Sequence, residues 1–277
     1  MTVAVKRLRP RDTRDGQDSA GTDSLKCLYR EIRIWQRLEH PHILPLLGIC
    51  HTITSFESIH VSIEHPDPMT SIGIVCPWME NGTLVDFLKL RQKKLENMEE
   101  LRLRLLISSV VHSKNIIHGD LHGGNVLVDS GGCVRLADFG LSAVVAEYRG
   151  KSRSGKGTVS SHHGGAFRWA APELVVVQEG AEPRLHPSAD MYSAGGLILQ
   201  AYTGKIPYPY YNDVLSALAI NAGKKPRRPT SDEANISNAL WSVIEECWRD
   251  DPLQRPTAAA LESRLQVIYS GLGGEQA

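Results

Sequence analysis

The sequence predicts an α+β fold with a small strand-rich N-terminal part and a larger helical C-terminal part. Three observations support this prediction. Short β-branched and aliphatic runs characterise the chain before Pro77, helical periodicity dominates after it, and one hairpin pattern interrupts the helical part. With 277 residues, of which 42% are hydrophobic and 22% charged, the chain can bury one large core or divide into two lobes.

The first elements are a strand, a loop and a helix. Residues 2–8 form a β-branched run that is typical of a strand, and the charged, glycine-containing residues 9–23 are expected to form a solvated loop. A helix is predicted over residues 24–38, because apolar side chains recur there at helical spacing. These side chains are Leu25, Leu28, Ile32, Trp35 and Leu38.

Two buried strands are predicted next, over residues 43–50 and 72–76. The polar segment 54–71 between them is expected to be an exposed hairpin or loop. Asn81-Gly82-Thr83 then opens a helix that we expect to span residues 83–90.

Within the helical part, residues 125–137 place two apolar runs around Asp-Ser-Gly-Gly, which is the turn chemistry of a β-hairpin. A helix is predicted before this hairpin, over residues 98–113. Residues 151–165 are rich in Ser, Gly, Lys and His and are expected to be flexible.

The most informative segment runs from His118 to Gly140. It contains Asp120, then Asn125 five residues later, then Asp138 a further thirteen residues on. Two carboxylates and an amide can supply oxygen ligands to a hard cation, while one carboxylate stays free to orient a hydroxyl nucleophile. The segment therefore predicts phosphoryl transfer with magnesium.

Glu31 lies on the apolar side of the predicted helix, and no cation lies three or four residues away on the same face. A buried carboxylate without a partner would cost several kcal/mol in desolvation. Lys6, on the preceding strand, is the expected partner. The alternative is that Glu31 turns toward solvent.

Several motifs occur together in a fixed order along the chain. They are VAVK at 3–6, Glu31, HGDLHGGN at 118–125, DFG at 138–140, AAPE at 170–173, DMYSAGG at 190–196 and RP at 255–256. In this combination the chain resembles a eukaryotic protein kinase domain. The resemblance implies a two-lobed fold, with residues 1–79 as a partial small lobe and hinge and residues 80–277 as the large lobe.

The resemblance also implies ATP and Mg²⁺ as cofactors and assigns site residues. Lys6 would hold the α- and β-phosphates of ATP while it pairs with Glu31. Asp120 would be the catalytic base. Asn125 and Asp138 would be the magnesium ligands.

Two further roles implied by the family are structural: Glu173 would pair with Arg255, and Asp190 would accept backbone N–H groups of the catalytic loop. At the adenine site, Cys76 would lie at the back of the pocket, and Pro77 to Met79 would form the hinge whose backbone bonds adenine. Cys76 could equally be an ordinary core residue, so both interpretations stay open.

The chain departs from the family pattern at several positions. Only Met1 and Thr2 precede VAVK, so the glycine-rich loop is missing, and we expect an N-terminally truncated chain in preference to a natural variant without the lid. Gly119 stands where many kinases have Arg. His122 replaces the usual Lys and is the candidate for contact with the transferring phosphoryl group, and Ala166 replaces the usual Thr beside it.

We therefore expect an ATP-dependent protein kinase, and the GAFRWAAPE sequence, which resembles the tyrosine-kinase-like group of serine/threonine kinases, favours Ser/Thr over Tyr as the acceptor. A catalytically impaired, kinase-like binding module is the main alternative. Two departures favour it: the glycine-rich loop that should cover ATP is missing, and His122 and Ala166 replace the usual Lys and Thr. A small-molecule phosphotransferase is a remote alternative, since HGDLHGGN and DFG resemble its signature too.

The charge and the cysteine content limit which binding partners and which cellular compartment we expect. With 31 basic and 31 acidic residues, nothing predicts a general attraction to nucleic acid or membrane, so the expected partner is a protein substrate. The five cysteines are widely spaced and are expected to be core residues in a reducing compartment. We expect no signal peptide and a cytoplasmic location, with the nucleus possible. The oligomeric state stays open.

Overall fold

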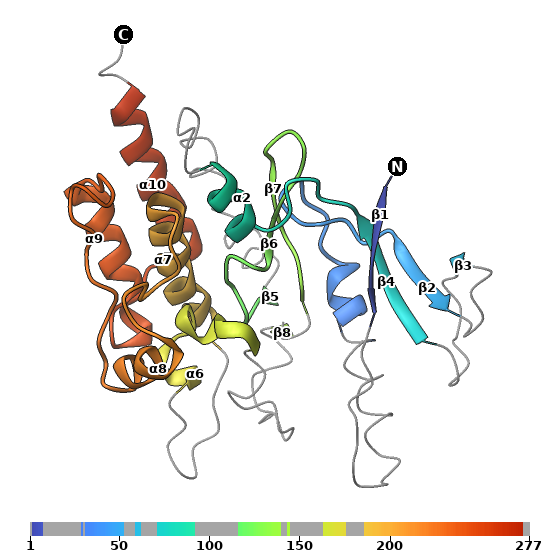
Figure 1. Cartoon of the computed structure of the whole chain (residues 1–277), viewed down its shortest axis with the longest axis horizontal. Coiled ribbons are helices and arrows are strands. Elements are labelled where there is room, and N and C mark those ends of the chain that lie inside the picture. Colours follow the sequence, from blue (N-terminus) through green and yellow to red (C-terminus); the bar gives the residue numbers. More distant parts are fainter. Residues whose placement is uncertain are drawn as a thin grey trace, which may run out of the picture.

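The computed structural model describes residues 2–7, 29, 31–52, 59–61, 71–91, 116–139, 143–144, 163–175 and 186–273. A small antiparallel sheet forms one side of the molecule and a group of helices forms the other, with a short hairpin between them (Figure 1). The α+β prediction is therefore confirmed.

The sheet has the strand order β1-β4-β2-β3, and every neighbouring pair is antiparallel. Its strands are β1 (Val3–Arg7), β2 (Gly48–Thr52), β3 (Ile59–Val61) and β4 (Ser71–Pro77). Among the described strands, β1 lies at an edge and pairs only with β4, in a register that sets Ala4 opposite Cys76. The pairing of β2 with β3 shows that part of the polar segment forms a hairpin, whereas residues 54–58 and 62–70 lie outside the described residues.

The strand predicted over residues 43–50 is wrong in its first half, because β2 begins only at Gly48. Ile43 instead forms an isolated parallel bridge with Leu136. The Leu44 N–H donates to the Leu136 carbonyl at 2.9 Å, and the Leu136 N–H donates to the His42 carbonyl at 2.8 Å. Pro45, which has no N–H to donate, follows directly. These contacts tie the N-terminal part to the hairpin, and the strand pattern alone could not distinguish them from sheet pairing.

The predicted N-terminal helix is confirmed where it is described, at residues 29 and 31–35, and it ends three residues earlier than expected. Residues 24–28 lie outside the described part. Trp35 is buried and donates its indole N–H to the Leu44 carbonyl, and its ring lies 5.7 Å from that of Phe139. The helix is thereby packed beside the residue that follows Asp138.

The hairpin is confirmed as β6 (Val126–Val128) paired with β7 (Val134–Leu136). Two short strands flank it in sequence and pair with each other, β5 (Ile116–Ile117) and β8 (Ala143–Val144). The predicted helix over 98–113 and most of the segment 151–165 lie outside the described residues.

The helical part is built around one buried helix. The helices are α2 (Leu84–Arg91), α6 (Pro172–Val175), α7 (Pro187–Thr203), α8 (Asp213–Asn221), α9 (Asn238–Cys247) and α10 (Ala258–Gly273), with 3-10 turns η2 (His163–Arg168) and η3 (Pro252–Gln254). Residues 188–201 of α7 are all buried, and α7 lies between the hairpin and α9 (Figure 1). Gly204 ends α7 with φ of 67°, which favours glycine.

The prediction that the cysteines are core residues is confirmed for Cys50, Cys76 and Cys247, which are buried, whereas Cys133 is only partly buried. Cys27 lies outside the described residues. Within the described residues, no helix combines the length and the apolar character needed to cross a bilayer.

Candidate active site

The loop of residues 118–125 connects β5 to β6 and is anchored to α7 by hydrogen bonds. The backbone N–H groups of His118 and Gly119 donate to the carboxylate of Asp190, at 2.8 and 2.9 Å. Asp190 is only 2% exposed, so both bonds lie in a low-dielectric interior. The predicted role of Asp190 in accepting loop N–H groups is confirmed. Gly119 has a φ of 79°, which suits a residue without a Cβ atom.

Asp120 and Asn125 are joined within this loop. The Asn125 side-chain amide donates to the Asp120 carbonyl at 2.9 Å and to Asp120 Oδ2 at 3.3 Å. The Asn125 carbonyl accepts the Ala137 N–H at 2.9 Å, which links the loop to the residue before Asp138. Because Asn125 uses its Nδ2 for Asp120, its Oδ1 is directed to neither bond and could serve as a metal ligand.

His122 lies beside Asp120. Its Nδ1 accepts the Gly124 N–H at 3.0 Å, so a neutral ring carries its proton on Nε2. Nε2 lies 3.7 Å from Asp120 Oδ2, and the ring packs against Trp169 at a centroid distance of 5.8 Å. Ala166 is buried and adds no polar group here. The side chain next to Asp120 is therefore an imidazole held in one orientation.

Lys6 joins the sheet to the loop that follows the hairpin. Its ammonium lies 3.0 Å from Glu31 Oε1 and 2.7 Å from Asp138 Oδ1. Glu31 is 5% exposed, so the prediction of Lys6 as its partner is confirmed and the alternative of a solvent-exposed carboxylate is wrong. Asp138 has a φ of 65°, an uncommon conformation for a residue other than glycine.

The pKa values of Lys6 and Glu31 are both raised at this site. Burial alone would lower the pKa of Lys6, but the charges of Asp138 and Glu31 outweigh it and raise this pKa above its ordinary value. Burial raises the pKa of Glu31; the charge of Lys6 opposes this rise, and that of Asp138 adds to it. One ammonium thus faces two carboxylates, which leaves a net negative charge at the site.

The segment expected to form the hinge ends strand β4. Cys76 is 7% exposed and belongs to the hydrophobic core, and burial raises the pKa of its thiol. Pro77 is half-buried and Met79 is buried, whereas Trp78 is 51% exposed. The Trp78 N–H donates to the Thr2 carbonyl at 3.0 Å. The core role of Cys76 is therefore confirmed, while its place at adenine stays a prediction.

The predicted pair of Glu173 and Arg255 is also confirmed. The two guanidinium nitrogens of Arg255 lie 2.6 and 2.9 Å from the two carboxylate oxygens of Glu173. The Arg255 side chain is fully buried and also donates to the Ser188 carbonyl. This pair fixes the segment after η2 to the helical part.

Sequence reasoning missed two contacts. It paired Lys6 with Glu31 but did not place it against Asp138, because nothing in sequence spacing relates those two residues. It also overlooked Gln200, which is 1% exposed and whose side chain fills the space where a Cβ atom of residue 123 would lie. An amide within the apolar stretch 189–202 was the available signal.

A family model described as protein tyrosine and serine/threonine kinase matches residues 1–265. The chain belongs to the protein tyrosine and serine/threonine kinase family. In protein kinases generally, ATP is the phosphoryl donor and Mg²⁺ accompanies it. Because the match runs through the C-terminal half, it favours the protein kinase interpretation over a small-molecule phosphotransferase.

Three similar kinases come from Arabidopsis thaliana. Serine/threonine-protein kinases STY17 and STY46 are 26% and 28% identical to this chain, each over 99% of it. Serine/threonine-protein kinase 12 is 28% identical, also over 99% of the chain. The matches cover 42%, 41% and 53% of these relatives, so the chain spans about half of their length or less.

Proposed function

We propose that this chain is a protein kinase that transfers the γ-phosphoryl group of ATP to a serine or threonine hydroxyl of a protein substrate. The observation that carries the proposal is the convergence of Lys6, Glu31 and Asp138 in one ion cluster, with the Asp120–Asn125 pair on the adjoining loop. The names of the similar plant kinases support Ser/Thr over Tyr.

Lys6 is the proposed ligand of the α- and β-phosphates. Glu31 is too deeply buried to act on substrate, and its proposed role is to hold the Lys6 ammonium in place. Since Lys6 donates to two carboxylates at once, its position is fixed before a nucleotide arrives. Such preorganisation is how a kinase site contributes most to rate, because the reaction depends on positioning and electrostatics.

Asp138 and Asn125 fit a magnesium site. Mg²⁺ is usually held by one or two carboxylates together with substrate phosphates, and a side-chain carbonyl is an acceptable oxygen ligand. Asp138 has a carboxylate that is 40% exposed, and Asn125 has Oδ1 outside its bonds to Asp120. The excess negative charge around Lys6 also favours a divalent cation. When bound, the metal would neutralise charge on the β- and γ-phosphates.

Asp120 is the proposed catalytic base. The Asn125 amide donates to Asp120 Oδ2, and His122 Nε2 lies 3.7 Å from the same oxygen. Asn125 and His122 would thereby orient the Asp120 carboxylate toward an incoming hydroxyl. Asp120 itself would accept the proton of that hydroxyl. His122 would also lie near the transferring phosphoryl group, where a neutral ring supplies less positive charge than a lysine would.

At the adenine end, we propose that the backbone of Pro77 and Met79 bonds the base and that Cys76 lines the back of its pocket. With this hinge, the proposed division places the small lobe at residues 1–79 and the large lobe at 80–277. The four described cysteines are unpaired, which supports a reducing location such as the cytoplasm or the nucleus.

A catalytically impaired binding module is the second candidate. The observation that favours it is the absence of a lysine and of a threonine hydroxyl beside Asp120 in the described residues, where His122 and Ala166 stand instead. The retained Lys6, Asp120, Asn125 and Asp138 oppose it, because a pure scaffold needs no such combination.

Radiolabelled ATP with generic protein substrates separates the two candidates. The chain is compared with its Asp120→Ala variant, with Asp250→Ala as a remote carboxylate control, and with a longer version that carries glycine-rich strands. Transfer that Asp120→Ala abolishes and Asp250→Ala preserves supports the kinase. Absence of transfer even from the longer version supports the binding module.

A further inference from the structure

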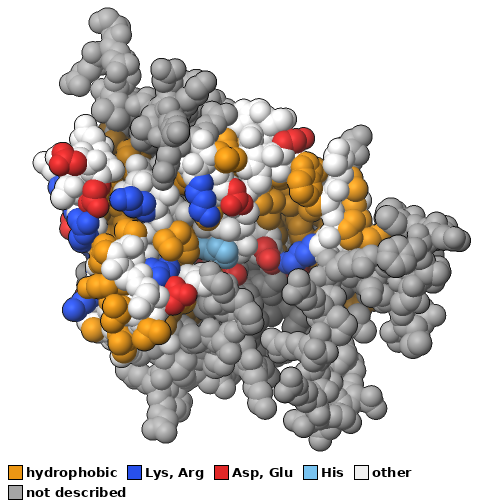
Figure 2. All heavy atoms as spheres, in the orientation of Figure 1, with side chains coloured by type: hydrophobic (Ala, Val, Ile, Leu, Met, Phe, Trp, Pro, Cys, Tyr) orange, Lys and Arg blue, Asp and Glu red, His pale blue; other side chains and the backbone are white. Residues whose placement is uncertain are grey.

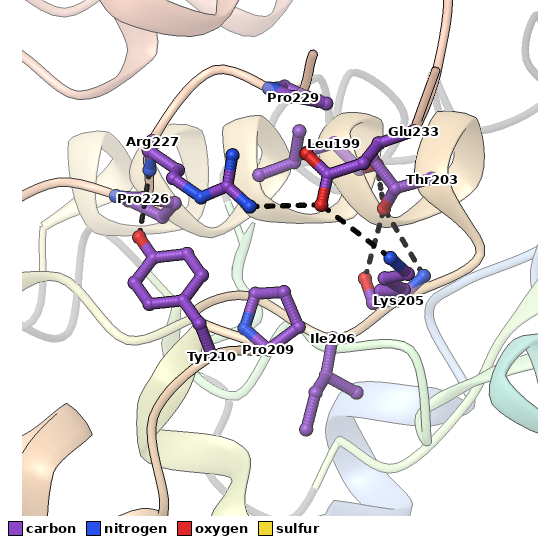
Figure 3. Close-up of a pocket in the computed structure, with 10 residues that line it drawn as sticks. All are labelled: Leu199, Thr203, Lys205, Ile206, Pro209, Tyr210, Pro226, Arg227, Pro229 and Glu233. Atoms are coloured by element: carbon purple, nitrogen blue, oxygen red, sulfur yellow. Dashed lines mark hydrogen bonds and ion pairs between the residues drawn. The ribbon is translucent and has the colours of Figure 1, made fainter.

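A pocket that contains no residue of the proposed active site lies at the C-terminal end of α7. It has an empty volume of about 340 Å³ including its open mouth, and Figure 3 shows the side chains around it. Its apolar surface comes from Leu199, Ile206 and three prolines, and its polar groups come from the loops before α8 and before α9. The lining residues are Leu199, Thr203, Lys205, Ile206, Pro209, Tyr210, Pro226, Arg227, Pro229 and Glu233.

Two cations and one carboxylate lie on the wall of this pocket. Glu233 Oε1 lies 2.9 Å from Arg227 Nη2 and 3.7 Å from Lys205 Nζ, as Figure 3 shows. The Thr230 N–H bond and then Arg227 lower the pKa of Glu233, so this carboxylate is ionised at neutral pH. One carboxylate therefore balances two cations, and the pocket keeps one excess positive charge.

The Arg227 guanidinium is held in a fixed position. It lies 5.2 Å from the centroid of the Tyr210 ring, and the Arg227 backbone N–H donates to the Tyr210 hydroxyl at 2.9 Å. Within the part of the chain that the structure describes, only its Nη2 has a side-chain partner. Arg227 is 50% exposed and Lys205 48% exposed, so both retain donors for a ligand.

We propose that this pocket binds a peptide segment of a partner protein in which a large apolar side chain adjoins a carboxylate. The apolar side chain lies against Ile206, Pro209 and Tyr210, and the carboxylate is bound by Arg227 and Lys205. A polyphosphate suits the site poorly, because Glu233 would repel part of its charge.

The surroundings favour a protein partner over a small metabolite. Helix α8 starts three residues after Tyr210 and exposes Val214, Leu215 and Leu218, at 69%, 48% and 59%. Figure 2 shows hydrophobic side chains gathered over this part of the molecule. Exposed aliphatic side chains close to a ligand pocket are typical of interaction surfaces.

The proposal is tested by methyl NMR on the whole chain with labelled isoleucines, titrated with N-acetyl-Phe-Asp-amide. The expected result is a saturable shift of the Ile206 methyl signal. N-acetyl-Phe-Asn-amide should bind about tenfold more weakly, because it lacks the charge that Arg227 and Lys205 recognise. N-acetyl-Ala-Asp-amide should also bind more weakly, because it lacks the ring.

Matched variants test whether Arg227 is responsible for the preference for the aspartyl peptide. Arg227→Gln should remove the preference for the aspartyl peptide, whereas Lys224→Gln, which changes the net charge equally on an exposed neighbouring side chain, should keep it. Asp120→Ala should bind as the unmodified chain does, which keeps this site separate from catalysis. No saturable shift at Ile206, equal binding of the two phenylalanyl peptides, or equal effects of the two Gln variants would overturn the proposal.

Discussion

The Asp138 carboxylate and the Lys6 ammonium lie 2.7 Å apart, although 132 positions separate the two residues in the chain. Lys6 comes from the edge strand of the sheet and Asp138 from the end of the hairpin. Their contact brings the N-terminal sheet onto the loop that carries Asp120 and Asn125. The proposed active site therefore depends on a single lysine that also neutralises the buried Glu31.

Replacing Lys6 should cost stability as well as activity. Lys6→Met leaves Glu31 buried without its cation, and because Lys6 is 39% exposed we expect a loss of roughly 1–3 kcal/mol in the free energy of unfolding, below that of a fully buried pair. Urea unfolding measures it. The double variant Lys6→Met with Glu31→Gln should recover most of the loss, and a double variant as unstable as Lys6→Met would contradict this account of Glu31.

The Glu173–Arg255 pair should be a major source of stability. Glu173→Ala leaves a fully buried guanidinium without its carboxylate, so we expect a loss of about 3–5 kcal/mol. Asp250→Ala removes the exposed pair with Lys225, in which the Asp250 side chain is 89% exposed, and should cost at most about 1 kcal/mol. Chemical denaturation of both variants gives the comparison. Similar losses in the two variants would show that burial does not determine how much the Glu173–Arg255 pair contributes to the free energy of unfolding.

Gly123 should tolerate no side chain. A Cβ atom there would clash with Oε1 of Gln200, a residue that is buried in α7. Gly123→Ala should therefore destabilise the protein by about 1–3 kcal/mol and lower the rate of phosphoryl transfer, since it displaces the loop that holds Asp120. Thermal unfolding and transfer assays check both effects.

Two variants control that experiment. Gly131→Ala, in the hairpin turn, brings a Cβ atom only to 3.5 Å from Asp129 and should be tolerated. Gln200→Ala combined with Gly123→Ala removes the clashing atoms and should restore part of the transfer rate. If the double variant is no more active than Gly123→Ala, the contact with Gln200 is not the cause.

His122 should act through its Nε2 atom. His122→Asn keeps an acceptor for the Gly124 N–H but removes the nitrogen that lies 3.7 Å from Asp120, whereas His122→Ala removes both. If Nε2 orients Asp120 and lies near the phosphoryl group, both variants should lower kcat by about tenfold or more with little change in KM for ATP. Steady-state kinetics decide this. An asparagine variant with full activity would limit His122 to a structural role.

The sequence predicted local and patterned features well. The hairpin after Asn125 followed from its turn residues and apolar runs. The partner of Glu31 followed from the lack of a cation three or four residues away on the same face of its helix. Long-range contacts were less accessible. The strand prediction for Ile43 and Leu44 failed because these buried residues bond to β7 across the molecule, which the same apolar pattern cannot reveal. The contact of Lys6 with Asp138 was not predicted, because nothing in their spacing along the chain relates the two residues.

The most direct test of the proposed kinase activity is the rate of magnesium-dependent phosphate transfer from labelled ATP to a generic serine- and threonine-containing protein. The comparison is between this chain and its Asp120→Asn variant, which keeps the size of the side chain but cannot accept a proton. The account predicts transfer by the chain and a loss of about 100-fold or more in the variant. Equal transfer by the two proteins would contradict it.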